Sequence, residues 1–373
     1  MLRTTIAAAA LLLSSPVLAQ TLDPAGAPPD PTVTPEPTPP PEAEAAPSLT
    51  PTVSGFIDGT YNYNFNRPAG GVTPYHTYTA PHQSFLLNAA HVALTGSDGK
   101  LSYAVEIDAG TDAFVNTLDD DFDVQEAWVS YTADTGLGFK AGKFVTTMGI
   151  EVIESGANPT ISRGFLFGLA EPFTHVGALG TYKINDRMDV AAGVINGWDV
   201  MVDNNSYKTM MGKFGLTLEQ FALVLSAYTG PEQPLNDDDW RTVFDATGVI
   251  KLGTIDIWVQ ANIGTEQNAG GGPPADPGDA TWTGIGVQPV FRLTEQFSLG
   301  ARAELFSDND GARTGFDQTL FNVSVAPAFA LTSHLTLRAE GRVDMSSEDV
   351  YVDTDGEASS SQIIALGEAL VSF

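Results

Sequence analysis

The sequence has no cysteine, few basic residues and, after residue 19, no apolar run long enough for a membrane-spanning helix. The lack of cysteine excludes disulfide bonds and thiolate metal sites. Only 17 Lys and Arg stand against 46 Asp and Glu, which gives a formal net charge of −29 over 373 residues. This charge repels nucleic acid and acidic substrates, so nucleic-acid binding is excluded. A membrane protein without apolar helices of about 20 residues must satisfy its backbone by closing a sheet.

Residues 1–19 have the pattern of a secretory signal peptide. Arg3 precedes the apolar block Ile6 to Leu13, and Val17 and Ala19 occupy the third-last and last positions before the expected cleavage site. The apolar block is too short to span a bilayer, and no cysteine follows the cleavage site to carry a lipid anchor. We therefore expect export through a cleaved signal peptide, and the strand pattern of residues 53–373 predicts the outer membrane of a Gram-negative bacterium as the destination.

Residues 20–52 are dominated by Pro, Ala, Thr and Glu. This composition buries little apolar surface, so we expect a disordered, extended tether on the periplasmic side. A specific partner such as the cell wall is an alternative, but no motif supports it.

From residue 53 onward, polar and apolar residues alternate with a period of two, which predicts β-strands. In segment 335–344, four charged residues alternate with Leu337, Ala339, Gly341 and Val343. The same alternation occurs in segments 53–65, 101–108, 255–264, 297–306 and 362–373. It suits a wall between water and lipid, although a soluble sandwich would show it too.

The lengths of the connections favour the membrane barrel. Tight links, such as Asn185 to Arg187 and Thr332 to His334, alternate with long polar segments. The long segments lie near 66–83, 112–122, 146–174, 199–206, 231–241, 265–280, 307–317 and 345–360. Short periplasmic turns and long outer loops are typical of outer-membrane barrels. We predict an all-β, antiparallel, up-and-down transmembrane barrel over 53–373 with about sixteen strands, fourteen or eighteen being alternatives.

The strand alternation also predicts which side chains line the pore. On the polar side of the strands lie Asp58, Asn62, Glu106, Asp108, Gln260, Arg302, Glu304, Arg338, Glu340, Arg342 and Asp344. A basic wall of Arg302, Arg338 and Arg342 facing loop carboxylates would set up a transverse field that orients solutes. Alternatively, acids on the same strands neutralise these arginines.

The longest connection, 146–174, is the candidate constriction loop. It carries Glu151, Glu154, Arg163 and Glu171 beside the apolar stretch 165–169. An apolar stretch needs burial, which folding into the barrel mouth would provide. Packing on the rim or on a neighbouring subunit is an equal alternative, and loops of this length are usually functional.

Acidic residues gather in the other long loops, where they would concentrate cations and repel anions over about 8 Å at physiological salt. We expect contacts with outer-membrane lipid and lipopolysaccharide. No catalytic residues and no cofactor are predicted, since neither a Gly-x-Ser-x-Gly nor a His-Glu-x-x-His motif occurs. His76 and His82 share a loop and could bind a metal, but they are more often surface polar residues.

Several stretches resemble the OmpL-like beta-barrel porins of Gram-negative bacteria. They are 55–68 (GFIDGTYNYNFNRP), 142–155 (GKFVTTMGIEVIES), 158–177 (NPTISRGFLFGLAEPFTHVG), 193–205 (GVINGWDVMVDNN), 228–233 (YTGPEQ) and 301–315 (ARAELFSDNDGARTG). The resemblance spans 53–373 and implies an outer-membrane barrel with pore activity, without established site residues. The Pro-rich segment and Thr147, where the family often has proline, depart from the pattern.

We therefore predict a porin for passive diffusion of small hydrophilic solutes and ions, weakly preferring cations. The alternatives are a non-conducting structural or adhesive barrel and an outer-membrane enzyme. A homotrimer is expected by analogy with porins of this size. The last strand should pair with 53–65, which places Phe373 at the periplasmic rim as the signal that the barrel-assembly machinery reads.

Overall fold

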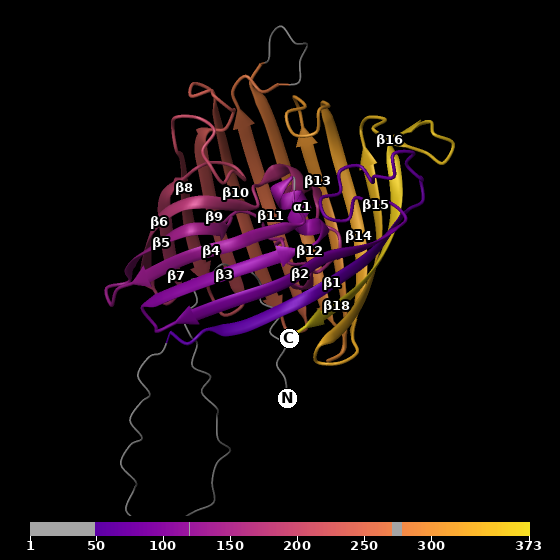
Figure 1. The fold of residues 1–373 in the computed structure, drawn as a ribbon. Coiled ribbons are helices and arrows are strands. Elements are labelled where there is room, and N and C mark those ends of the chain that lie inside the picture. The colour runs from indigo at the N-terminus through magenta and orange to yellow at the C-terminus, as the bar shows by residue number, and fades with distance from the viewer. Residues whose placement is uncertain (1–48, 119, 271–277) are drawn as a thin grey trace, which may run out of the picture.

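The computed structural model describes residues 49–118, 120–270 and 278–373, which form one closed antiparallel β-barrel of sixteen strands (Figure 1). The predicted signal peptide and nearly all of the predicted tether lie outside the described residues. No helix of the described part is long and apolar enough to cross a membrane.

Consecutive strands are neighbours all round the barrel. The strands are β1 (Thr52–Asn64), β2 (Ser84–Ser97), β3 (Leu101–Ala109), β4 (Phe122–Thr132), β5 (Leu137–Val145), β6 (Thr174–Asn185), β7 (Met188–Ile195), β8 (Thr209–Thr217), β9 (Phe221–Pro231), β10 (Trp240–Leu252), β11 (Ile255–Glu266), β12 (Ala280–Arg292), β13 (Phe297–Asp308), β14 (Gln318–Ala330), β15 (Leu335–Ser346) and β18 (Ser361–Ser372). The predicted architecture is thus confirmed, and the count is sixteen rather than fourteen or eighteen.

The first and last strands close the barrel. β1 pairs with β18 in a register that runs from Phe56 opposite Ser372 to Asn64 opposite Ile364. Closure leaves no open sheet edge, so the backbone hydrogen bonds of the wall are made between strands.

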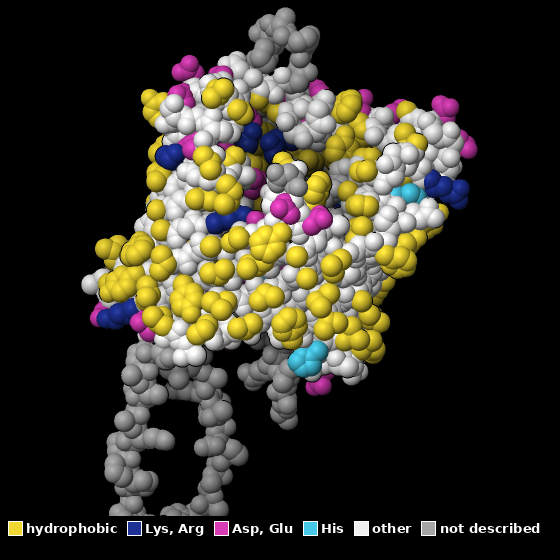
Figure 2. All heavy atoms as spheres, in the orientation of Figure 1, with side chains coloured by type: hydrophobic (Ala, Val, Ile, Leu, Met, Phe, Trp, Pro, Cys, Tyr) yellow, Lys and Arg dark blue, Asp and Glu magenta, His cyan; other side chains and the backbone are white. Residues whose placement is uncertain are grey.

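The outer face of the barrel is apolar, as a lipid-facing surface requires. Phe244, Ile285 and Ile263 point outward and keep 57%, 61% and 47% of their surface exposed. Figure 2 shows hydrophobic side chains across the middle of one side of the wall and acidic ones near the upper loops. The inward positions between them are largely polar, which accounts for the period of two.

The connections are short at one end of the barrel and long at the other, where several contain further structure (Figure 1). A seven-residue helix, α1 (Thr111–Thr117), follows β3, and a small hairpin of β16 (Tyr351–Val352) and β17 (Ala358–Ser359) precedes β18. The connection between β5 and β6 contains a 3₁₀ turn, Ser155–Ala157, and a π-helical turn, Leu166–Ala170. The sequence patterns predicted only loops at these places.

Candidate functional site: the barrel lumen

The connection between β5 and β6, residues 146–173, lies inside the barrel; we call it the inward loop. On one side, the backbone N–H of Gly149 donates to Asp245 Oδ1 of β10 (3.1 Å). On another, Ser155 Oγ donates to Glu368 Oε1 of β18 (2.5 Å). The loop therefore reaches from β10 to β18 within the lumen, so of the two alternatives it lies in the interior and not on the rim.

Arg302 of β13 anchors the inward loop from the wall. Its side chain is completely buried and its Nη1 donates to Glu151 Oε1 (2.9 Å) and to Ser162 O (2.6 Å) of the loop. Its Nε donates to Asn322 Oδ1 of β14 (2.9 Å). Removing one partner of a buried ion pair leaves an uncompensated charge, so these contacts hold the loop in one position on the wall.

Arg338 and Arg342 of β15 hold the loop in the same way. Arg338 forms a bidentate ion pair with Glu368 and donates to the loop carbonyl of Asn158 (2.9 Å). Arg342 pairs with Asp344 (2.7 Å) and donates to the carbonyl of Arg163 (2.6 Å). The arginines are therefore neutralised by a mixture of wall and loop carboxylates rather than facing open water.

Two wall carboxylates accept hydrogen bonds from the loop backbone. Glu340 accepts from the N–H groups of Ile161 (2.7 Å) and Ser162 (2.8 Å). Glu304 accepts from the N–H groups of Phe165 (2.6 Å) and Leu166 (3.2 Å). These charge-assisted bonds satisfy backbone donors that burial would otherwise leave unpaired.

The predicted loop residues have different roles. Arg163 donates to loop carbonyls, including that of Ile161 (2.7 Å), and so ties the loop to itself. Glu154 accepts from Gln125 of β4, while Glu171 accepts from Gln260 of β11 (2.6 Å). Burial, together with the charge of Asp245, raises the pKa of Glu171 well above its usual range.

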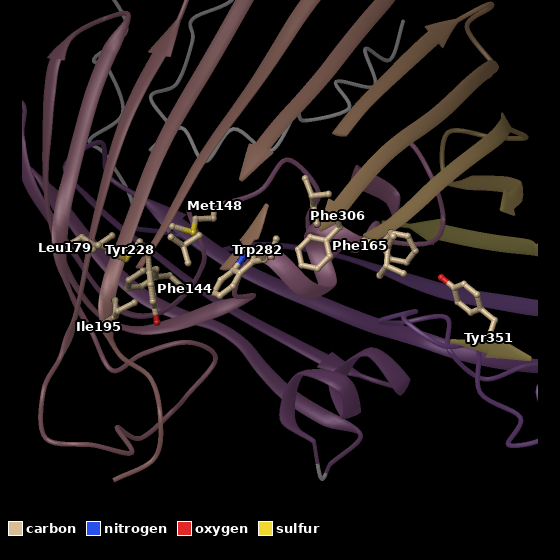
Figure 3. Packing of buried hydrophobic residues seen from close by; sticks show 14 residues of the cluster. Phe144, Met148, Phe165, Leu179, Ile195, Tyr228, Trp282, Phe306 and Tyr351 are labelled. Carbon is tan, nitrogen blue, oxygen red and sulfur yellow. The ribbon is translucent and has the colours of Figure 1, made fainter. Parts of the chain in front are cut away.

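The apolar stretch of the loop is buried among aromatic side chains. Phe165 and Leu166 are at most 2% exposed and pack with Trp282, Phe306 and Tyr351 (Figure 3). Each large side chain buried in this way contributes roughly 2 kcal/mol. The wall makes room for the loop, since a Cβ at Gly300 would lie 2.1 Å from the carbonyl oxygen of Pro159.

The connection between β1 and β2 also folds inward. His76 is 7% exposed, its Nε2 lies 3.2 Å from Asp344 Oδ2, and its Nδ1 lies 3.1 Å from Thr79 Oγ1. Burial and the charge of Arg342 lower the pKa of His76 to about 4. The surface interpretation of His76 was wrong. His82 instead accepts from the backbone of Asn64 (2.9 Å), and the described residues contain no group of three His, Asp or Glu able to hold a metal.

The predicted pore-lining residues are mostly covered by these inward segments. Ten of the eleven are buried: Asp58, Asn62, Asp108, Gln260, Arg302, Glu304, Arg338, Glu340, Arg342 and Asp344. Glu106 remains partly exposed, at 20% of its side chain. Glu368 was missed as the partner of Arg338, although its polar position on an alternating strand was a signal for it.

A cavity of about 290 Å³ remains between the first half of the inward loop and the wall. Its wall side is formed by β3, β4 and β8 to β11, and residues 145–154 form most of its loop side. The cavity is lined by four carboxylates, Glu106, Glu126, Glu151 and Glu154, by Lys213, and by threonine and apolar side chains. A solute in this cavity would lie beside charged groups.

The model of one protein family, Putative beta-barrel porin-2, OmpL-like, matches residues 51–373. The chain belongs to this porin family. It is accordingly a porin-like outer-membrane β-barrel. No curated protein matches the chain.

Solved outer-membrane proteins share the fold at low sequence identity. An anion-selective porin from Comamonas acidovorans aligns with a TM-score of 0.60 at 10% identity, over 87% of this chain and 99% of that one. The channel DcaP of Acinetobacter baumannii aligns with a TM-score of 0.63 at 8% identity, over 87% of this chain and 97% of that one. OmpT of Vibrio cholerae aligns with a TM-score of 0.58 at 15% identity, over 87% of this chain and 97% of that one.

Proposed function

We propose that the protein is a porin that lets small hydrophilic solutes and ions diffuse through the outer membrane without catalysing a reaction. The observation that carries this proposal is the charged cavity inside a closed barrel whose outer face is apolar. Family membership supports it. The test is stepwise conductance of the refolded protein in planar bilayers, and a folded protein without steps would exclude the pore.

A non-conducting barrel is the second candidate, favoured by the ten buried wall residues and the inward loop. Water-filled space is then confined to the cavity. Comparing KCl conductance with that of a loop-deleted variant separates the two candidates, because a plugged barrel conducts only after the deletion.

We further propose a weak cation preference. It is supported by the net charge of −29 and by exposed acids in the outer loops, such as Asp355 and Glu357. One structural relative is described as anion-selective, but at 10% identity it shares only the fold. The reversal potential in a salt gradient tests this proposal, and an anionic sign would refute it.

Export through a cleaved signal peptide over residues 1–19 of a Gram-negative protein, a Pro-rich tether over 20–52, lipopolysaccharide contacts and recognition by the barrel-assembly machinery complete the proposal. We add a homotrimer, since one structure of OmpT from Vibrio cholerae is described as a trimer form. Cross-linking of native membranes tests the trimer.

A further inference from the structure

The cavity beside the inward loop has one apolar side and one acidic side. The apolar side is formed by Met148, Ile150 and Val152 of the loop and by Val224, Val249 and Trp258 of β9, β10 and β11. Inward positions of a porin wall are normally polar, because they face water. Three neighbouring strands that present apolar side chains to the lumen therefore indicate a surface suited to an apolar body.

The acidic side carries more negative than positive charge. Glu106, Glu126 and Glu154 come from β3, β4 and the inward loop, and they lie close enough to repel one another. Two basic groups offset part of this charge: His91 Nε2 is 3.7 Å from Glu106, and Lys140 Nζ is 3.9 Å from Glu126. His91 is already held by Asp108 at 2.8 Å. An added cation would relieve this repulsion.

The opposite side of the cavity offers a hydrogen-bond donor. Trp258 is 4% exposed, and its Nε1 has no hydrogen-bond partner among the described residues. A buried N–H without a partner is unusual, and the face of an aromatic ring bound in the cavity would accept from it. Lys213 also lines the cavity, but its ammonium is already paired with Asp189 at 2.9 Å.

We propose that this cavity binds small amphipathic organic cations, an amine on an apolar body, as the class of solute that the porin prefers. The inference rests on the proposed porin function and names its substrate class. The ammonium lies against Glu106, Glu126 and Glu154, and the apolar body lies against Val249 and the loop. The volume of about 290 Å³ sits at the lower limit of ligand cavities, which suits a molecule with a single ring.

Four related solutes test the proposal on the folded, full-length protein. Calorimetry in detergent measures the affinities of phenylethylammonium, phenylethanol, phenylpropionate and ethylammonium at neutral pH. The first has both the charge and the apolar body, and each of the others lacks or reverses one of them. We expect phenylethylammonium to bind about tenfold more tightly than phenylethanol or ethylammonium, and phenylpropionate to bind least.

Substitutions test the roles of the acidic and the apolar side of the cavity separately. The double variant Glu106→Gln with Glu126→Gln keeps the shapes and should reduce the affinity for phenylethylammonium about tenfold while leaving phenylethanol nearly unchanged. Val249→Ser should weaken both aromatic solutes. Glu295→Gln, in the exposed turn after β12, removes one carboxylate far from the cavity and is the matched control.

The outcomes separate this inference from the porin itself, because KCl conductance is recorded on the same preparation. If the protein conducts KCl but binds phenylethylammonium and phenylethanol equally, or prefers phenylpropionate, the inference is overturned and the proposed porin function stands. If the protein binds the amine but carries no current, the proposed porin function is overturned and the assigned ligand class is supported. Loss of amine affinity in Glu295→Gln equal to that in the double variant also overturns the inference.

Discussion

The backbones of Gly55 and Phe373 exchange two hydrogen bonds of 3.0 Å each where the barrel closes. A Cβ at Gly55 would lie 2.7 Å from Cζ of Phe373, so the aromatic ring lies directly over the glycine. The last residue thus seals the seam with both its backbone and its side chain.

Removing the Phe373 ring should impair assembly more than conduction. Phe373→Ala keeps the two backbone bonds but uncovers Gly55, and it removes the terminal aromatic that we expect the assembly machinery to read. The folded fraction in outer membranes, measured by heat-modifiable gel mobility, should fall several-fold. Channels that do assemble should keep their conductance. Val371→Ala, on the outward side of the same strand, is the control, and an equal defect there would refute a special role for Phe373.

Loss of Arg302 should release part of the inward loop. Arg302→Met removes the ion-pair partner of the buried carboxylates Glu151, Glu304 and Glu340, which costs about 3–5 kcal/mol. Denaturant unfolding measures this loss. Lys100→Met is the control, because the Lys100 side chain is 50% exposed beside Asp134, which is 84% exposed, and its loss should cost at most about 1 kcal/mol. Similar losses in the two variants would argue against the loop anchor.

Deleting residues 161–169 should raise conductance, since this part of the loop occupies the lumen against Glu304 and Glu340. Single-channel recording in planar bilayers measures the change. A deletion variant that remains folded but conducts as before would mean that ions pass without meeting this segment.

Acid should loosen the connection between β1 and β2. The pKa of His76 is about 4 in the folded protein and 6.5 in an unfolded chain, so the unfolded state binds the proton more readily. The stability that neutral His76 contributes is present above pH 6.5 and falls by roughly 3 kcal/mol as the pH drops towards 4. Hydrogen exchange of residues 66–83 should therefore accelerate on acidification.

His76→Gln should remove most of this acid dependence. His82→Gln, in the same connection but near the surface, should retain it. If both variants behaved like the parent protein, the acid response would have to come from another group.

The sequence predicted the barrel because its signal is local. Alternation within each strand indicates which side chains face lipid. The lengths of the connections indicate which end of the barrel carries the short turns and which carries the long loops. Alternation indicated that Glu368 faces inward, but its pairing with Arg338 depends on the register of β15 with β18, which local patterns do not give. Ile364 and Leu366 were an overlooked signal, since they interrupt the polar inward face of β18 and pack against Ile161 of the loop.

The path of the inward segments could not be predicted from local sequence patterns. His76 is buried only because its connection turns back into the lumen to meet Asp344, which is 268 positions further along the chain. Similarly, the apolar residues 165–167 indicated burial, but several places could have provided it. Such long-range contacts depend on the shape of the completed barrel.

The inward loop also has a mechanical consequence. It is attached to β10 through Asp245, to β13 through Arg302 and to β18 through Glu368. Attachments on separated strands make the loop a cross-brace that resists flattening of the barrel when lateral pressure in the lipid changes. We expect the cross-section of its cavity to change less than that of an unbraced barrel when the membrane around it is stretched or compressed.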